Sequence, residues 1–190
     1  MIDHQHKLIF VHIPKTGGTS IEYALTGREK GHDHKTISDF QAEYSNLFKQ
    51  YFKFTVVRNP WDRLVSGFFY YKSGGNQSKK DKAFATKYGH NFKAFVEQID
   101  SYDSRHFLNK QLTYINIGGV NVMDHILRFE TLSADFKKLA IKLNIQHTTL
   151  NTLRQSKHKH YTEHYDDKTI EIVAKKYAQD IEYFGYKYGE

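Results

Sequence analysis

Residues 7–20 are KLIFVHIPKTGGTS, and the architecture of the chain follows from this stretch. Its first half, residues 7–13, is a short apolar run rich in branched side chains, which predicts a buried strand. Pro14 ends the run. The residues after the two glycines predict a short helix that Gly27 closes. A buried strand that passes through a tight turn into a helix is typical of α/β proteins.

Two further strands are predicted along the chain. Residues 52–58 (FKFTVVR) form the second, and a helix follows with Asn59 at the N-cap and Pro60 at its first position. Residues 125–129 (HILRF) form the third, ahead of apolar residues at helical spacing over 132–143. This alternation of strands and helices predicts an α/β fold with a short central parallel sheet flanked by helices.

Other elements are predicted by periodicity and capping. Residues 38–51 predict one amphipathic helix, in which Ser38 and Gln41 have capping-box spacing. A weaker helix is expected over 104–114, and a long terminal helix over 170–184. A glycine-rich, basic loop spans 73–82. With 190 residues and no linker of low complexity, the chain is predicted to be a single domain over 1–190.

Composition narrows the class of protein. The chain has 28 Lys and Arg against 21 Asp and Glu, a formal charge of +7, which favours anionic partners. It has no cysteine, which excludes a disulfide framework and a cysteine zinc site. No apolar run has the ~20 residues that a membrane span needs, and residues 1–7 do not resemble a signal peptide. We therefore expect a cytoplasmic protein without membrane or nucleic-acid partners; oligomeric state is not indicated.

The turn after the first strand has the composition of a phosphate-binding loop. Its glycines let the backbone wrap closely around a ligand, and the following helix start favours an anion. Hydroxyl groups and one ammonium group add donors. The residues predicted to bind phosphate here are Lys15, Thr16, Gly17, Gly18, Thr19 and Ser20. The lysine precedes the glycines, unlike the lysine of the usual NTPase loop.

The turn after the second strand predicts a second anion site. Arg58 ends the strand, and Asn59, Arg63 and Ser66 share one face of the next helix. This face can bind a second phosphate with Arg58 as a bidentate clamp. The alternative is that both arginines form surface ion pairs. Both turns follow parallel strands, so we expect Lys15 and Arg58 at the same edge of the sheet.

These two segments together resemble the PAPS-dependent sulfotransferases, in particular the carbohydrate branch. HIPKTGGTSI is similar to that family's 5′-phosphosulfate loop, and FTVVRNPWDRLVSGFF to its 3′-phosphate segment. Weaker similarity continues in HILRFETL and near the C-terminus. The resemblance implies a nucleotide-kinase-like fold of the P-loop type. It also implies that residues 15–20 hold the 5′-phosphosulfate and that Arg58 and Ser66 hold the 3′-phosphate.

The resemblance also implies the remaining candidate residues. The His-x-His segment at residues 32–34 is similar to one that carries the catalytic histidine of hexuronic-acid sulfotransferases. This similarity favours His34 as the base, with His32 as the second choice. The alternative is that the segment is a solvated loop. His106 and Gln111 lie in a segment similar to one near the acceptor cleft. Arg154 lies in a basic stretch that the family closes over its ligands. The alternative for His106 and Gln111 is a partly buried helix with ordinary polar positions, and for Arg154 it is a basic, solvated stretch.

The expected reaction is in-line transfer of a sulfuryl group from 3′-phosphoadenosine 5′-phosphosulfate (PAPS) to a hydroxyl group, with a carbohydrate the favoured acceptor. The product nucleotide is 3′-phosphoadenosine 5′-phosphate (PAP), and no metal is expected. Lys15 would stabilise charge on the leaving phosphate oxygen. Two other classes stay open. One is an ATP-dependent small-molecule kinase, for which Glu130 could hold a metal. The other is a binding protein without catalysis.

Overall fold

The computed structural model describes residues 1–27, 33–88, 90–102, 106–151, 153 and 158–190. It divides into two compact units, each assembled from two stretches of sequence. The first contains Met1–Arg58 and Lys110–Arg154, and the second Asn59–Asn109 and Gln155–Glu190. Each unit buries its own hydrophobic cluster. That the whole chain is one domain stays a prediction.

The first unit contains a four-stranded sheet in the order β1-β2-β3-β6. Its strands are β1 (Ile2–Asp3), β2 (Leu8–Val11), β3 (Phe52–Val57) and β6 (His125–Arg128). β2, β3 and β6 are parallel, and β1 is antiparallel to β2. This confirms the predicted α/β class with a central parallel sheet. The three predicted strands are present within two residues of their expected ends.

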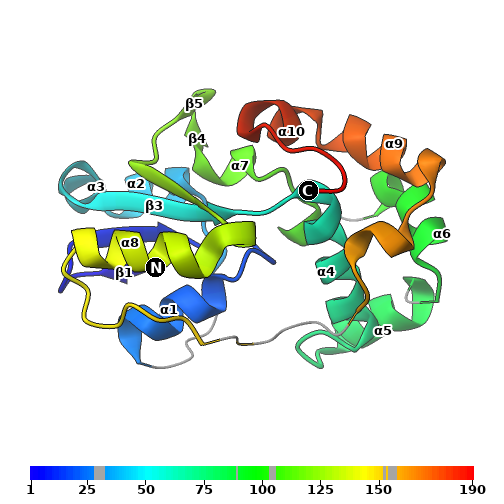
Figure 1. Cartoon of the computed structure of the whole chain (residues 1–190), viewed down its shortest axis with the longest axis horizontal. Helices are drawn as coiled ribbons and strands as arrows, with labels where there is room; N and C mark the ends of the chain where they lie inside the picture. Colours follow the sequence, from blue (N-terminus) through cyan, green and yellow to red (C-terminus); the bar gives the residue numbers. More distant parts are fainter. Residues whose placement is uncertain (28–32, 89, 103–105, 152, 154–157) are drawn as a thin grey trace. The chain divides into compact units, whose positions relative to one another are not determined.

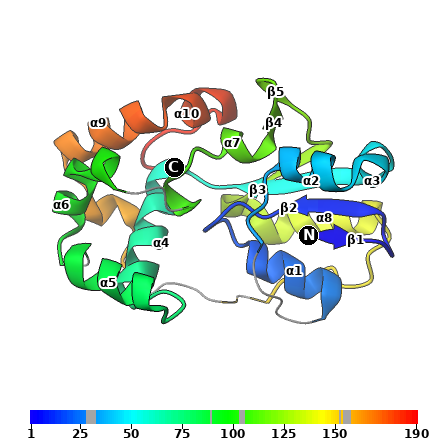
Figure 2. The same cartoon turned by 180° about the vertical axis from the view of Figure 1, so that it is seen from behind.

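Helices cover both faces of this sheet. Leu8, Phe10, Phe54 and Val56 face α1 (Gly18–Thr26) and α8 (Leu132–Lys142) in one buried cluster. Their strand neighbours face the opposite side because side chains alternate along a strand. Figures 1 and 2 show α2 (Ile37–Glu43) and α3 (Ser45–Gln50) on that opposite side. The sheet is therefore buried on both faces, as is typical of parallel sheets.

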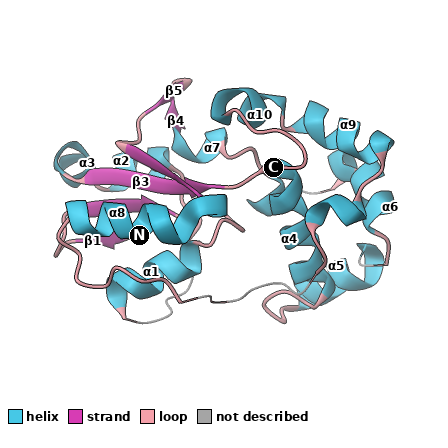
Figure 3. Ribbon diagram, viewed as in Figure 1, coloured by secondary structure: helices cyan, strands magenta, loops and turns pink. Residues whose placement is uncertain are grey.

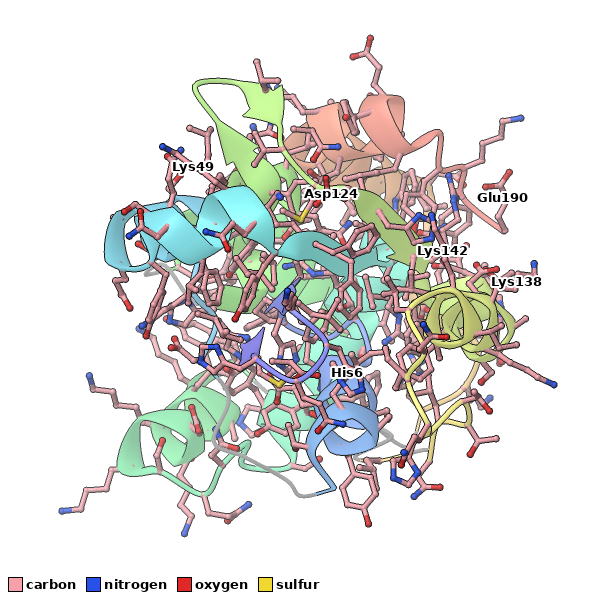
Figure 4. The ribbon with its side chains drawn as sticks, turned by 90° about the vertical axis from the view of Figure 1, so that its left-hand side faces the viewer. His6, Lys49, Asp124, Lys138, Lys142 and Glu190 are labelled. Carbon is pink, nitrogen blue, oxygen red and sulfur yellow. The ribbon has the colours of Figure 1, made fainter. Side chains whose placement is uncertain are left out.

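Short elements complete the first unit. They are α7 (Leu112–Ile115), the hairpin strands β4 (Asn116–Ile117) and β5 (Val120–Asn121), and the 3₁₀ turn η3 (Phe129–Thr131). Lys138 and Lys142 lie one turn apart on the outer face of α8, where both side chains are exposed (Figure 4).

The described part of the second unit contains helices and turns but no strand (Figure 3). Its elements are α4 (Pro60–Lys72), α5 (Lys79–Tyr88), α6 (Phe92–Glu97), η1 (Ile99–Ser101), η2 (His106–Leu108), η4 (Tyr161–His164), α9 (Asp167–Lys176) and α10 (Ala178–Phe184). α4 begins as predicted, with the Asn59 side chain accepting from the Trp61 N–H at 3.1 Å. Aromatic side chains, among them Phe68 and Phe95, fill its core.

Two buried tyrosines tie distant segments of the second unit together. The Tyr165 hydroxyl donates to the Trp61 carbonyl (2.9 Å), and the Tyr177 hydroxyl donates to the Leu108 carbonyl (3.1 Å). Burial raises the pKa of both phenols above the ordinary value, so both keep the proton that they donate.

Three predicted helices were wrong in their extent. The helix expected over 38–51 is two helices that meet at Tyr44, and the capping box is made by Thr36 and Asp39 instead of Ser38 and Gln41. The terminal helix breaks at Tyr177, whose backbone leaves the helical region. In place of one helix over 104–114, the described residues form the 3₁₀ turn η2 and the start of the short helix α7.

No helix among the described residues is both long and apolar enough to span a bilayer.

Candidate active site

The turn that follows β2 has an unusual backbone. Lys15 has φ 68° and Gly17 has φ 85°, both in the left-handed region. A lysine in this region costs about 1–2 kcal/mol relative to ordinary backbone. Left-handed residues within a turn gather backbone N–H groups into a concave surface that binds anions. Such strain is typical of functional turns.

The N-terminus of α1 carries no side-chain cap among the described residues. Its N-cap is Gly17, and its first turn contains no acidic residue. By contrast, α2 and α9 both begin with a complete capping box. An uncapped helix start leaves N–H groups and the positive end of the helix dipole for an external anion.

Space around the two glycines is closed by other side chains. A Cβ on Gly18 would lie 2.1 Å from Cδ2 of His12, and a Cβ on Gly17 would lie 2.9 Å from Cδ2 of Leu132. Both distances are shorter than real carbon contacts allow. A Cβ at Gly18 would displace the His12 ring, and one at Gly17 would displace the end of Leu132 at a positive φ, so both positions favour glycine.

Two of the predicted hydroxyl groups are engaged within the protein. Thr16 is fully buried and donates from Oγ1 to the Ile13 carbonyl at 2.9 Å. Because a hydroxyl has one proton, Thr16 shapes the turn and cannot donate to a phosphate in this conformation. Ser20 accepts from the Leu153 N–H at 3.3 Å, which leaves its proton for another acceptor. The Ser20 N–H donates to the Gly17 carbonyl.

Arg58, at the end of β3, lies against this turn. It donates from Nη1 to the Lys15 carbonyl at 3.1 Å, and its guanidinium carbon is 3.8 Å from the centre of the Phe129 ring. Phe129 begins the turn that follows β6. The ends of three parallel strands therefore meet around one guanidinium group, as expected for Lys15 and Arg58 at one edge of the sheet.

Gln111 holds the backbone of Arg58. Its Oε1 accepts from the Arg58 N–H (2.9 Å), and its Nε2 donates to the Arg58 carbonyl (2.8 Å). Gln111 is fully buried. The predicted contact of Gln111 with a substrate stays a prediction. The geometry gives the Gln111 side chain a structural role. It pairs with both the N–H and the carbonyl of Arg58, as the backbone of a neighbouring strand would, just beyond the end of β3.

His34 lies beside the same turn. Its Nδ1 is 3.0 Å from the His12 carbonyl, and the two rings meet edge to face with centroids 4.8 Å apart. A carbonyl oxygen only accepts, so Nδ1 of His34 carries the proton. In the neutral ring, Nε2 then holds the lone pair that a general base needs.

Three residues at this site, His12, Glu22 and Phe129, were not predicted. His12 is a buried polar residue at the end of an apolar run, and Glu22 is a buried acid on α1. The polarity of His12 within a run expected to be apolar was the signal that could have found it; no sequence signal marked Glu22 or Phe129.

The other predicted residues lie elsewhere. Ser66 is buried in α4, and His106 is exposed in η2; both belong to the second unit, and their roles stay predictions. Arg63 is buried, and its guanidinium donates to the Asn109 carbonyl. His32 and Arg154 lie outside the described residues.

Within the described residues, no group of three or more His, Asp or Glu side chains is arranged to hold a metal ion. The expectation of a metal-free reaction stays a prediction.

A parallel sheet with a glycine-rich turn and an arginine at one edge is typical of α/β proteins that bind anionic ligands there. The chain belongs to the sulfotransferase family, whose model matches residues 1–187.

Individual relatives are carbohydrate sulfotransferases. Carbohydrate sulfotransferase 10 of Xenopus laevis is 24% identical over 98% of this chain and 66% of its own length. Human carbohydrate sulfotransferase 10 is 34% identical over 34% of this chain and 23% of its own length. Rat carbohydrate sulfotransferase 11 is 30% identical over 47% of this chain and 29% of its own length. This chain therefore spans less than two thirds of these relatives. No solved structure matches it significantly.

Proposed function

We propose that this chain transfers a sulfuryl group from PAPS to a hydroxyl group of a carbohydrate. Membership of the sulfotransferase family supports the reaction class, and the names of the relatives support the acceptor class. The observation that carries the proposal is the contact of Arg58 with the Lys15 carbonyl, which unites the two predicted phosphate-binding turns.

The turn after β2 fits a phosphosulfate. Its backbone is left-handed at Lys15 and Gly17, the start of α1 has no side-chain cap, and Lys15 supplies a positive charge, features that favour a bound anion. Arg58 adds a planar cation whose position is fixed by Phe129 and Gln111. We assign the 5′-phosphosulfate to residues 15–20, where Thr16 contributes its backbone and not its hydroxyl, and the 3′-phosphate to Arg58; the role expected for Ser66 stays a prediction. The nucleotide-kinase-like fold of the P-loop type belongs to the same proposal.

Charge accounts for the roles of the residues. Bound PAPS supplies a sulfuryl group on a phosphate oxygen that becomes more negative as the bond to sulfur breaks. Lys15 and the first amides of α1 stabilise that oxygen. Nε2 of His34 takes the proton of the acceptor hydroxyl while the hydroxyl oxygen forms the new bond to sulfur. The proton ends on His34 and the electron pair on the leaving phosphate oxygen.

The test is binding and transfer with purified protein. We expect PAP to raise the melting temperature without Mg²⁺, and to do so more than ATP does. Labelled sulfate from PAPS should appear on members of a carbohydrate acceptor panel, read by mass. Stabilisation by ATP with Mg²⁺ alone would indicate the kinase instead. PAP binding without transfer to any acceptor would indicate a binding protein.

Two variants test the assigned roles. Lys15→Ala should nearly abolish transfer while the fold is retained, and Lys138→Ala, an exposed lysine on α8, is the matched control. His34→Ala should lower turnover far more than PAP affinity. Equal losses of turnover and affinity would give His34 a structural role.

A further inference from the structure

Beneath the phosphate-binding turn lies a buried pair of ionisable side chains. His12 and Glu22 are each 4% exposed, and Nδ1 of His12 is 3.1 Å from Oε1 of Glu22. His12 follows the last residue of β2, and Glu22 lies in the second turn of α1. Burying two such groups is costly unless they are paired. A carboxylate only accepts, so Nδ1 of His12 is the donor.

The ring of His12 fills the space between the strand end and the helix start. A Cβ on Gly18 would lie 2.1 Å from Cδ2 and 2.3 Å from Nε2 of this ring. The ring also stacks on Phe10, with centroids 5.8 Å apart and planes 26° from parallel. The hydrogen bond to Glu22 fixes the rotation of the ring. The position of Gly18 therefore depends on where this imidazole lies.

The same residue also contacts the candidate base. The main-chain oxygen of His12 accepts from Nδ1 of His34, and the edge-to-face contact of the two rings limits the orientation of His34. His12 thus touches the candidate phosphate loop through its ring, and the candidate base through its ring and its carbonyl.

We propose that His12, held by Glu22, is a positioning residue that sets the orientation of the His34 ring relative to the phosphate-binding turn. This inference rests on the proposed function. Its physical basis is that a reacting group displaced by about 1 Å loses on the order of 100-fold in rate. His12 itself touches neither substrate nor reacting atoms in this scheme.

The test variant is His12→Asn. Asparagine keeps a short side chain with an amide donor toward Glu22 and removes the ring that contacts Gly18 and His34. His6→Asn is the matched control, because His6 forms a similar pair with Asp3 (2.6 Å) near the start of the chain (Figure 4). We expect His12→Asn to lower kcat about 10–100-fold with a smaller change in PAP affinity, and His6→Asn to leave both unchanged.

A second readout does not depend on catalysis. NMR of the histidine side chains reports which nitrogen of His34 is protonated. We expect one dominant Nδ1–H form in the unaltered protein. His12→Asn keeps the main-chain acceptor but removes the ring that limits the orientation of His34, so we expect part of the His34 population to lose this hydrogen bond and to show the Nε2–H form. An unchanged His34 spectrum together with an unchanged kcat would overturn the proposal. If the unaltered protein transfers no sulfuryl group, the proposed function fails, and the His34 spectrum still decides the positioning role.

Glu22 provides a variant that avoids loss of the fold. Glu22→Gln keeps an oxygen acceptor for His12 at the same place, and Glu22→Leu removes it. We expect Glu22→Gln to retain most of kcat and Glu22→Leu to reproduce the His12→Asn effect. Equal rates for these two Glu22 variants at equal folding stability would contradict the role of the hydrogen bond.

Discussion

The guanidinium of Arg58 donates a hydrogen bond from Nη1 to the main-chain oxygen of Lys15 at 3.1 Å, while its face lies 3.8 Å from the Phe129 ring centre. These contacts use the planarity of the group as well as its charge. They also link residues 43 positions apart in the sequence. Arg58 therefore fixes the path of the turn and supplies a cation to it.

The first prediction follows from this planarity. Arg58→Lys keeps the charge but cannot maintain both the hydrogen bond and the stacked contact. We expect PAP affinity to fall about 10–100-fold, equivalent to about 1.5–3 kcal/mol. Calorimetric titration with PAP measures this loss. Arg58→Met keeps the apolar stem of the side chain and removes the charge, so its PAP affinity should be lower still. Unaltered affinity in Arg58→Lys would mean that only the charge matters.

The second prediction concerns Gly17. Gly17→Ala places a Cβ 2.9 Å from Leu132 and forces alanine to φ 85°, so it should lower stability by about 2–4 kcal/mol and weaken PAP binding. Gly27→Ala is the control, because Gly27 at the other end of α1 also has a positive φ (68°) but nothing lies within 4 Å of its Cβ. It should cost about 1 kcal/mol. Urea unfolding measures both variants, and equal losses would exclude the steric contribution.

The third prediction separates a structural role of Gln111 from a role in acceptor binding. Gln111→Leu leaves the buried N–H and carbonyl of Arg58 without these partners, which should destabilise the fold by about 2–4 kcal/mol. Gln50→Leu, at the exposed end of α3, should cost much less. Unfolding curves give the comparison. A raised acceptor KM at unchanged stability would instead favour the role in substrate binding.

The fourth prediction concerns pH. Burial, followed by the nearby His158, lowers the pKa of His164, although Lys159 and Glu163 act on it as well. A lowered pKa means that the unfolded chain takes up this proton at a higher pH than the folded chain does. The contribution of His164 to stability is therefore complete above about pH 6.5 and is lost as the pH falls through the folded value.

Replacing the His164 imidazole by a ring that does not titrate tests its pH-dependent contribution to stability directly. Nε2 of His164 is buried without a hydrogen-bond partner in the described structure, and the ring packs on Phe69. His164→Phe should therefore reduce the loss of stability between pH 7.5 and pH 5. His90→Phe, at an exposed position, should leave that loss unchanged. Thermal melts across this pH range provide the measurement, and parallel curves for both variants would refute the prediction.

Sequence patterns predicted the parts of the fold that depend on local chemistry. The three parallel strands are short segments rich in branched and aromatic side chains, and the start of α4 follows from Asn59 and Pro60, whose capping chemistry acts over three residues. The meeting of Lys15 and Arg58 followed from sheet topology alone, because parallel strands end at one edge.

Long-range contacts account for what the patterns did not predict. Tyr177 continues the helical spacing, but its buried hydroxyl bonds to Leu108 and the backbone leaves the helix there. Thr16 has a hydroxyl group of the kind that binds phosphate, yet this hydroxyl donates its proton to the Ile13 carbonyl. His12 and Glu22 could not be paired from spacing, since a strand residue and a helix residue meet only after the turn has formed.

The interleaving of the two units along the chain has a consequence for how the protein is made. The first unit needs β6 and α8, so its core cannot close on the ribosome until the chain has been synthesised past Lys142, the end of α8. The second unit needs α9, close to the C-terminus. No single cut releases one unit whole and free of the other, so neither can be obtained by simple truncation.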